Sequence, residues 1–166
     1  VIKSITKFNV LKGNSNIEKF IEVNIIPTML KDAPVHMNKK RRVNEKGNAL
    51  EKAFSLSKEI KLKGQGYPDR AFEYNNEIVY VEIKLFNKNN ISHTNRTFTL
   101  CPPLSKINSD GYHYLIGFEH EDEILNKHYH IIDLYDLSIT LKYEWNTNNK
   151  NIYKKWNYLK HINVIY

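Results

Sequence analysis

Residues 67–86 read YPDRAFEYNNEIVYVEIKLF, and the strands of the predicted fold are easiest to place from this segment. Two runs within it, Arg70 to Tyr74 and Glu77 to Phe86, are rich in valine, isoleucine, phenylalanine and tyrosine, a composition typical of β-strands. Asn75-Asn76 separates the two runs and suits a two-residue hairpin loop, because asparagine tolerates positive φ. The sequence therefore predicts a β-hairpin here.

The register of this hairpin brings two acidic side chains together. If Tyr74 faces Glu77, then Asp69 lies opposite Glu82, and opposed residues have Cβ atoms about 5 Å apart on one face of the sheet. Lys84 shares that face because it is two residues beyond Glu82. Close carboxylates repel each other, and a hard divalent cation such as Mg²⁺, which prefers oxygen ligands, would relieve that repulsion.

This arrangement suits the hydrolysis of a phosphodiester. A bound divalent cation makes its water acidic enough to attack, and it polarises a phosphoryl oxygen. Lys84 would orient the attacking water or stabilise the developing negative charge. The pattern of acid, spacer and acid-x-lysine therefore indicates a metal-dependent nuclease.

A structural interpretation of the same residues competes with the catalytic one. Pro-Asp is a common turn opening, and Glu-x-Lys is common on exposed strands. The setting favours catalysis, because the second strand alternates strictly and the hairpin places the acids together without adjustment. One face of that strand carries Val79, Val81, Ile83 and Leu85, and the other carries Tyr80, Glu82 and Lys84.

Composition limits the class of protein. A chain of 166 residues with 41% hydrophobic residues suits one folded domain over 1–166. A net charge of +7 implies an anionic partner, nucleic acid before membrane. No apolar run has transmembrane length, and no signal peptide is recognised. One cysteine, Cys101, excludes an internal disulfide framework and indicates a reducing compartment, so we expect a cytoplasmic location.

The coarse pattern along the chain predicts a fold of the α/β (mixed α+β) class, with a central mixed β-sheet flanked by helices. The predicted helices cover Asn16 to Leu30 (with Asn16 or Ser15 as N-cap), Asn44 to Lys58, a short segment from Pro103 to Asn108, and Asn148 to Lys160. Pro27 disfavours the last part of the first helix, because proline lacks a backbone N–H. Asp32 to Arg42 is predicted to be a loop. Besides the hairpin, the predicted strands cover Tyr112 to Glu119, Lys127 to Tyr135 and Ile139 to Trp145.

The chain resembles the PD-(D/E)xK nuclease superfamily and, within it, the type II restriction endonucleases. The resemblance rests on Pro68-Asp69, on Glu82-Ile83-Lys84 and on the predicted helix with Asn48-Ala49-Leu50-Glu51. It is clear over 44–86, and it implies a catalytic core at about 44–135 in which the third core strand is Tyr112 to Glu119.

The resemblance also implies roles for individual residues. Mg²⁺, which Mn²⁺ can replace, would be bound by Asp69, Glu82, Glu51 and the Ile83 carbonyl, and Lys84 would assist the attacking water. Glu45 and Glu59 are weaker candidates than Glu51. A solvated helix glutamate, paired with a neighbouring lysine, is the structural alternative for Glu51.

Two segments are candidates for DNA binding. The first is the densest basic run, Lys39, Lys40, Arg41 and Arg42, which precedes the predicted helix and could clamp a DNA backbone or be a solvated loop. The second leaves the catalytic strand directly after Lys84. Its polar residues, of which asparagine and arginine suit base edges, are Lys88, Asn89, Asn90, His93, Asn95 and Arg96.

We therefore expect a Mg²⁺-dependent endodeoxyribonuclease of the type II restriction class that cuts double-stranded DNA at a short site. A homodimer would place one active site on each strand, and a cognate DNA methyltransferase would protect host DNA. One alternative is a structure-specific or repair nuclease of the same superfamily. The other is a nucleic-acid-binding module in which Asp69 and Glu82 are structural.

Overall fold

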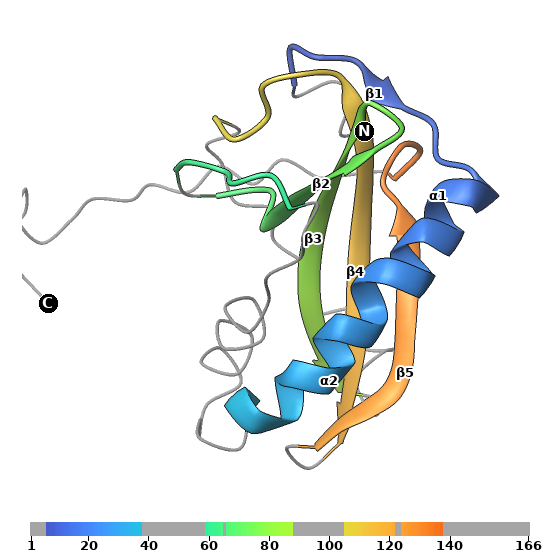
Figure 1. Cartoon of the computed structure of the whole chain (residues 1–166), viewed down its shortest axis with the longest axis vertical. Coiled ribbons are helices and arrows are strands. Elements are labelled where there is room, and N and C mark those ends of the chain that lie inside the picture. Colours follow the sequence, from blue (N-terminus) through green and yellow to red (C-terminus); the bar gives the residue numbers. More distant parts are fainter. Residues whose placement is uncertain (1–5, 38–58, 65, 88–104, 122–123, 138–166) are drawn as a thin grey trace, which may run out of the picture.

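The computed structural model describes residues 6–37, 59–64, 66–87, 105–121 and 124–137, and these residues form a twisted mixed sheet with one long helical segment along it (Figure 1). The predicted mixed sheet is confirmed. The predicted helices over 44–58 and 148–160 and the predicted strand over 139–145 lie outside the described residues.

The hairpin consists of β2 (Arg70–Tyr74) and β3 (Glu77–Asn87), which pair antiparallel with Tyr74 opposite Glu77 and Arg70 opposite Val81. The loop residues Asn75 and Asn76 have φ values of 50° and 65°. Two successive residues with positive φ are what a type I′ turn requires, and this turn matches the twist of the two strands. The predicted loop and register are therefore confirmed.

Strand β4 (Gly111–Glu121) is the centre of the sheet and runs parallel to β3 along its whole length. Its other edge is shared by β1 (Val10–Leu11), which pairs parallel with the start of β4, and by β5 (Ile124–Asp133), which pairs antiparallel with the remainder. The third core strand is thus confirmed at the predicted position. The strand predicted over 127–135 is also present, although it begins earlier and ends at Asp133.

The helical segment comprises α1 (Ser15–Phe20), a π-helical turn η2 (Ile21–Ile25) and α2 (Ile26–Met37). Its N-cap is Asn14, whose side-chain oxygen accepts hydrogen bonds from the backbone N–H groups of Asn16 and Ile17, so the predicted cap at Ser15 or Asn16 is wrong. Asn14 takes this role because its backbone is extended, as an N-cap requires.

The predicted loop over 32–42 is wrong for residues 32–37, which continue α2. Proline normally disrupts a helix because it lacks an N–H group and its ring meets the carbonyl four residues back. Here the turn before Pro27 is already widened, since the Ile26 N–H bonds to the Ile21 carbonyl five residues earlier. A π-helical turn of this kind accommodates the irregularity and lets the helix continue. None of the helices in the described part of the chain has the length and apolar character needed to cross a membrane.

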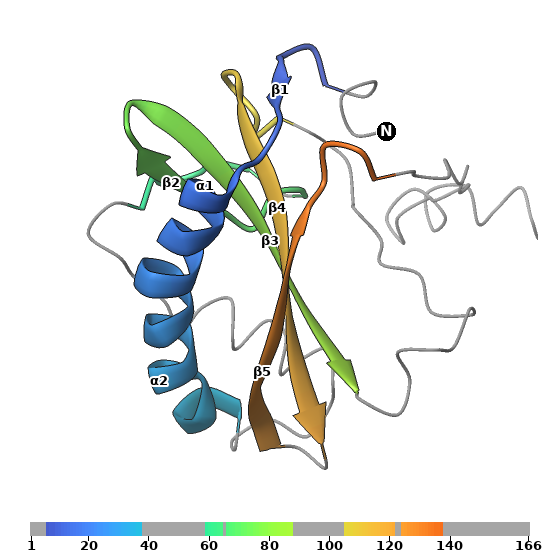
Figure 2. The same ribbon diagram turned by 90° about the vertical axis from the view of Figure 1, so that its right-hand side faces the viewer.

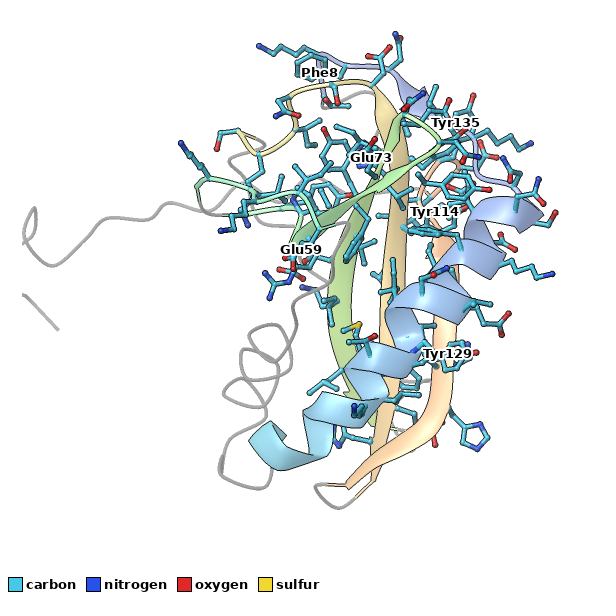
Figure 3. All side chains as sticks on the ribbon, viewed as in Figure 1. Phe8, Glu59, Glu73, Tyr114, Tyr129 and Tyr135 are labelled. Atoms are coloured by element: carbon cyan, nitrogen blue, oxygen red, sulfur yellow. The ribbon has the colours of Figure 1, made fainter. Side chains whose placement is uncertain are left out.

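The helical segment lies along one face of the sheet and buries an apolar stripe there (Figure 2). Ile17, Ile21 and Ile25 are fully buried, and they pack in one cluster with Val79 and Val81 of β3. Figure 3 shows Tyr114 of β4 on this helical side as well. The predicted apolar face of β3 is confirmed, and the buried isoleucines of the helical segment recur at helical spacing. This packing leaves the opposite face of β3, with Tyr80, Glu82 and Lys84, for other contacts.

The short helix predicted from Pro103 to Asn108 is not observed in its described part. Residues 105 and 106 form a turn, and residues 107 and 108 have no regular structure. The physical reason is tertiary: Ile107 is buried in a second apolar cluster with Tyr80 and Leu115, and the Asn108 N–H donates to the Tyr80 hydroxyl at 3.3 Å. Ile107 and Asn108 make these contacts just before the chain enters β4, in place of a helical turn.

Gly111 allows β3 and β4 to approach closely, and its substitution provides a test of the sheet. A Cβ atom at this position would lie 2.6 Å from the Ile78 carbonyl oxygen, which belongs to the backbone. We therefore expect Gly111→Ala to lower the free energy of unfolding by about 1–3 kcal/mol in urea denaturation. Gly117→Ala is the control, since its Cβ would meet only the movable ring of Phe86 at 3.1 Å and Leu115 at ordinary contact distance. Equal stability of the two variants would contradict this parallel pairing.

Candidate active site

The hairpin register brings Asp69 to Glu82 and Ile83. Asp69 directly precedes β2, and its Oδ2 atom accepts a hydrogen bond of 2.7 Å from the backbone N–H of Ile83. This bond anchors the Asp69 carboxylate on β3, next to the carboxylate of Glu82. The structure therefore brings together the two acids that the sequence predicted to be opposed.

Glu82 is a buried acid, and only one of its two carboxylate oxygens is paired with a cation. The residue is 4% exposed, and its Oε1 atom is paired with the Lys84 ammonium. Its Oε2 atom is buried and accepts no hydrogen bond from the described residues. A buried carboxylate oxygen of this kind costs free energy unless a partner is supplied.

The environment of Glu82 favours its neutral form. Burial is the largest cause that raises the pKa of Glu82, the negative charge of Asp69 also raises it, and the positive charge of Lys84 lowers it, so that the pKa is about 7 in all. Desolvation and a like charge both disfavour an ionised acid. The arrangement is therefore electrostatically unfavourable by itself and would be relieved by an additional positive charge.

Lys84 extends from the same face of β3 as Glu82, as their separation by two residues requires. Its side chain is 25% exposed, so the ammonium is at the boundary between the buried acid and solvent. A lysine in this place can meet a ligand that approaches the carboxylates from outside.

A donor set of this kind fits a divalent cation. Mg²⁺ is held by one or two carboxylates, with water and substrate phosphate completing its coordination. Asp69 and Glu82 would supply the two carboxylates, and the Oε2 atom of Glu82, which accepts no hydrogen bond from the described residues, would supply a ligand atom. Among the described residues no group of three histidine, cysteine, aspartate or glutamate side chains gathers to form a larger site.

Two buried residues beneath the acidic pair were not predicted from the sequence. Tyr67 and His113 are 1% and 0% exposed, and the Tyr67 hydroxyl lies 2.7 Å from Nδ1 of His113. Burial lowers the pKa of His113 to about 4, and burial together with the charges of Glu82 and Asp69 raises the pKa of Tyr67. The neutral ring and the protonated hydroxyl therefore share a hydrogen bond, which anchors the chain immediately before Pro68-Asp69.

A pocket of about 450 Å³ opens beside Asp69. Glu59 lies against β2 at its wall, where its carboxylate is 3.1 Å from the Arg70 guanidinium (Figure 3). The Lys106 ammonium donates to the Pro68 carbonyl at 2.8 Å. We call this the Lys106 pocket, and its lining residues are Glu59, Ile60, Lys61, Leu62, Asp69, Arg70 and Lys106.

Sequence reasoning missed Lys106 because no local pattern marks it. It follows a long polar stretch and reaches Pro68 only through the tertiary fold. Glu59, a weaker metal candidate, lies near Asp69 but is engaged by Arg70. The other predicted site residues lie outside the described residues: Glu51, Glu45, Lys39, Lys40, Arg41, Arg42, Lys88, Asn89, Asn90, His93, Asn95 and Arg96.

Comparison with known proteins agrees with the resemblance seen in the sequence. The family model described as the type II restriction enzyme MjaV family matches residues 1–156. The type II restriction enzyme MjaV of Methanocaldococcus jannaschii is 34% identical, over 69% of this chain and 61% of its own length. The chain thus spans about three fifths of that relative. No solved structure matches the chain. The match over residues 1–156 shows that the chain belongs to the type II restriction enzyme MjaV family.

Proposed function

We propose that this protein is a Mg²⁺-dependent endodeoxyribonuclease that hydrolyses both strands of duplex DNA at a specific short site, as a type II restriction enzyme does. The observation that carries the proposal is the gathering of Asp69, Glu82 and Lys84 at one point of the hairpin, with a buried carboxylate oxygen that accepts no hydrogen bond from the described part of the chain. Membership of a restriction enzyme family supports the same activity.

In this proposal Asp69 and Glu82 hold the divalent cation, with the Ile83 carbonyl and Glu51 as further ligands. The cation, when bound, acidifies water and polarises the phosphoryl oxygen. The Ile83 N–H keeps the Asp69 carboxylate in place through its bond to Oδ2, so the acid is preorganised before any ligand arrives. Mn²⁺ has similar ligand preferences and would be accepted in place of Mg²⁺.

Lys84 provides positive charge where negative charge develops on the substrate. Its ammonium is paired with Glu82 and remains partly exposed, so it can turn toward a phosphate or toward the attacking water. An ammonium held beside the reacting phosphate would stabilise the charge of the transition state more than that of the ground state.

Duplex DNA is the proposed substrate, and the net charge of +7 favours binding to its backbone. The basic run over 39–42 would contact phosphates, and the segment over 88–96 would read bases. A single domain over 1–166 would act as a homodimer, because two symmetric active sites match the two strands of a palindromic site. We further propose a cytoplasmic location and a cognate methyltransferase as partner in the same system.

The proposal is tested by incubation of unmethylated phage or plasmid DNA with the full chain, in Mg²⁺ and in EDTA. We expect discrete fragments that appear only with Mg²⁺, and sequencing of their ends gives the site. A metal-dependent smear would instead favour the structure-specific or repair nuclease. If DNA from every source stays intact with every metal but still binds in a salt-sensitive way, the protein is a nucleic-acid-binding module without catalysis.

A further inference from the structure

The Lys106 pocket adjoins the acidic pair but has the opposite electrostatic character. One of its acidic residues, Glu59, is neutralised by Arg70 at 3.1 Å. The other, Asp69, directs one oxygen to the Ile83 N–H and belongs to the proposed metal site. The remaining charged residues of the lining are Lys61 and Lys106.

Neither of these lysines has an acidic partner among the described residues. The Lys106 ammonium has three donors, and its bond to the Pro68 carbonyl uses one of them. That bond holds the ammonium at the wall of the pocket, one residue from Asp69. The lining therefore has two lysines without an acidic partner among the described residues, and its one acid not paired with a cation is Asp69, the proposed metal ligand. Such a lining suits an anion.

We propose that the Lys106 pocket is a phosphate subsite, in which Lys61 and Lys106 bind the DNA backbone phosphate next to the one that is cut. The inference rests on the proposed nuclease function, because it places the scissile phosphate at Asp69 and Glu82. The neighbouring phosphate of the same strand then lies beside Asp69, where the pocket opens. Lys106 has a second role as a positioning residue, since it holds the carbonyl of Pro68, which precedes Asp69.

The test is the salt dependence of DNA binding, measured by fluorescence anisotropy with a labelled duplex that contains the mapped site, in EDTA so that no cleavage occurs. Each phosphate contact that is lost reduces the slope of log Kd against log salt by about 0.9. We expect Lys61→Ala and Lys106→Ala each to reduce the slope by about one contact and to weaken binding by about tenfold at low salt. Lys63→Ala is the matched control, because Lys63 is exposed on the same segment but does not line the pocket, and its slope should stay at the wild-type value.

The outcomes separate this inference from the proposed nuclease function. If the wild type cleaves DNA but all three variants keep its slope, the subsite is refuted and the nuclease stands. If the wild type never cleaves, but Lys61→Ala and Lys106→Ala reduce the slope with a duplex of arbitrary sequence, the two lysines bind a backbone phosphate, whereas the nuclease and the placement of that phosphate next to a scissile one are refuted. A lower melting temperature of Lys106→Ala with an unchanged slope would reduce Lys106 to a structural role and overturn the proposal. An equal loss of slope in Lys63→Ala would also overturn it, since the effect would then be that of general surface charge.

Discussion

Lys84→Ala is expected to lower the rate of DNA cleavage by about 10²–10³-fold, the loss typical when one preorganised charge-stabilising donor is removed. The lysine is partly exposed and sits beside the buried carboxylate of Glu82, so its truncation removes a positive charge from the substrate side of the site. The charge of Lys84 also lowers the pKa of Glu82, and its loss therefore makes the acid still harder to ionise. Single-turnover cleavage of a plasmid that carries one mapped site measures the effect.

Lys19→Ala is the matched control for this variant. Lys19 is an exposed lysine of α1, which packs on the face of the sheet opposite to Glu82 and Lys84. The control removes the same charge from the chain and should cleave at the wild-type rate. If Lys84→Ala keeps the wild-type rate as well, or if both variants lose activity to the same extent, Lys84 has no place in the chemistry.

Glu82→Gln is expected to abolish cleavage and, at the same time, to stabilise the metal-free protein at pH 8. The folded protein holds the pKa of Glu82 at about 7, above the ordinary value of 4.5. As the pH rises from about 4.5 to 7, the unfolded chain loses this proton first, so the ionisation of Glu82 favours unfolding and stability is lost across that window. Above the folded pKa the loss is complete, and it amounts to at most about 3 kcal/mol.

Glutamine has nearly the same shape and cannot ionise, so it avoids this cost. We expect the free energy of unfolding of Glu82→Gln to exceed that of the wild type by about 1–3 kcal/mol at pH 8 and to match it closely at pH 5. Glu73→Gln provides the control, because Glu73 is an exposed residue of β2 in the same hairpin. Urea denaturation at the two pH values measures the difference. If Glu82→Gln is less stable than the wild type at pH 8, the folded protein stabilises the ionised carboxylate, and its burial carries no such cost.

The hairpin and its acidic pair could be predicted from the sequence because the determining signals are local. Asn75-Asn76 specifies the turn, the turn specifies the register, and the register places Asp69 at Glu82. The predicted apolar face of β3 likewise follows from the alternation of Val79, Val81 and Ile83 within one strand. Each of these predictions depends on residues that are close together in the chain.

Which polar residues are buried, and which distant side chains support the site, depends on contacts between segments far apart in the chain. No local sequence pattern indicates such contacts. The strict alternation of β3 predicted which residues share a face with Glu82, but not that Tyr80 and Glu82 would be buried. His113 reaches Tyr67, and Lys106 reaches Pro68, across long separations in the sequence. The length of α2 was missed for a related reason, because the widened turn at Ile21–Ile25 offsets the effect of Pro27 and is invisible in residue spacing.

Asp69 and Glu82 form an electrostatically unfavourable pair, and a bound divalent cation would remove the cost of that pair. Melting temperatures of the wild type and of Glu82→Gln at pH 8, recorded as the Mg²⁺ concentration is raised at constant ionic strength, test this role of the cation. A ligand that binds the folded state alone stabilises it by about 2.7 kcal/mol at a concentration of one hundred times Kd. We expect Mg²⁺ to raise the melting temperature of the wild type and to leave that of Glu82→Gln nearly unchanged. An equal response of the two proteins, or no response of the wild type, would contradict this expectation.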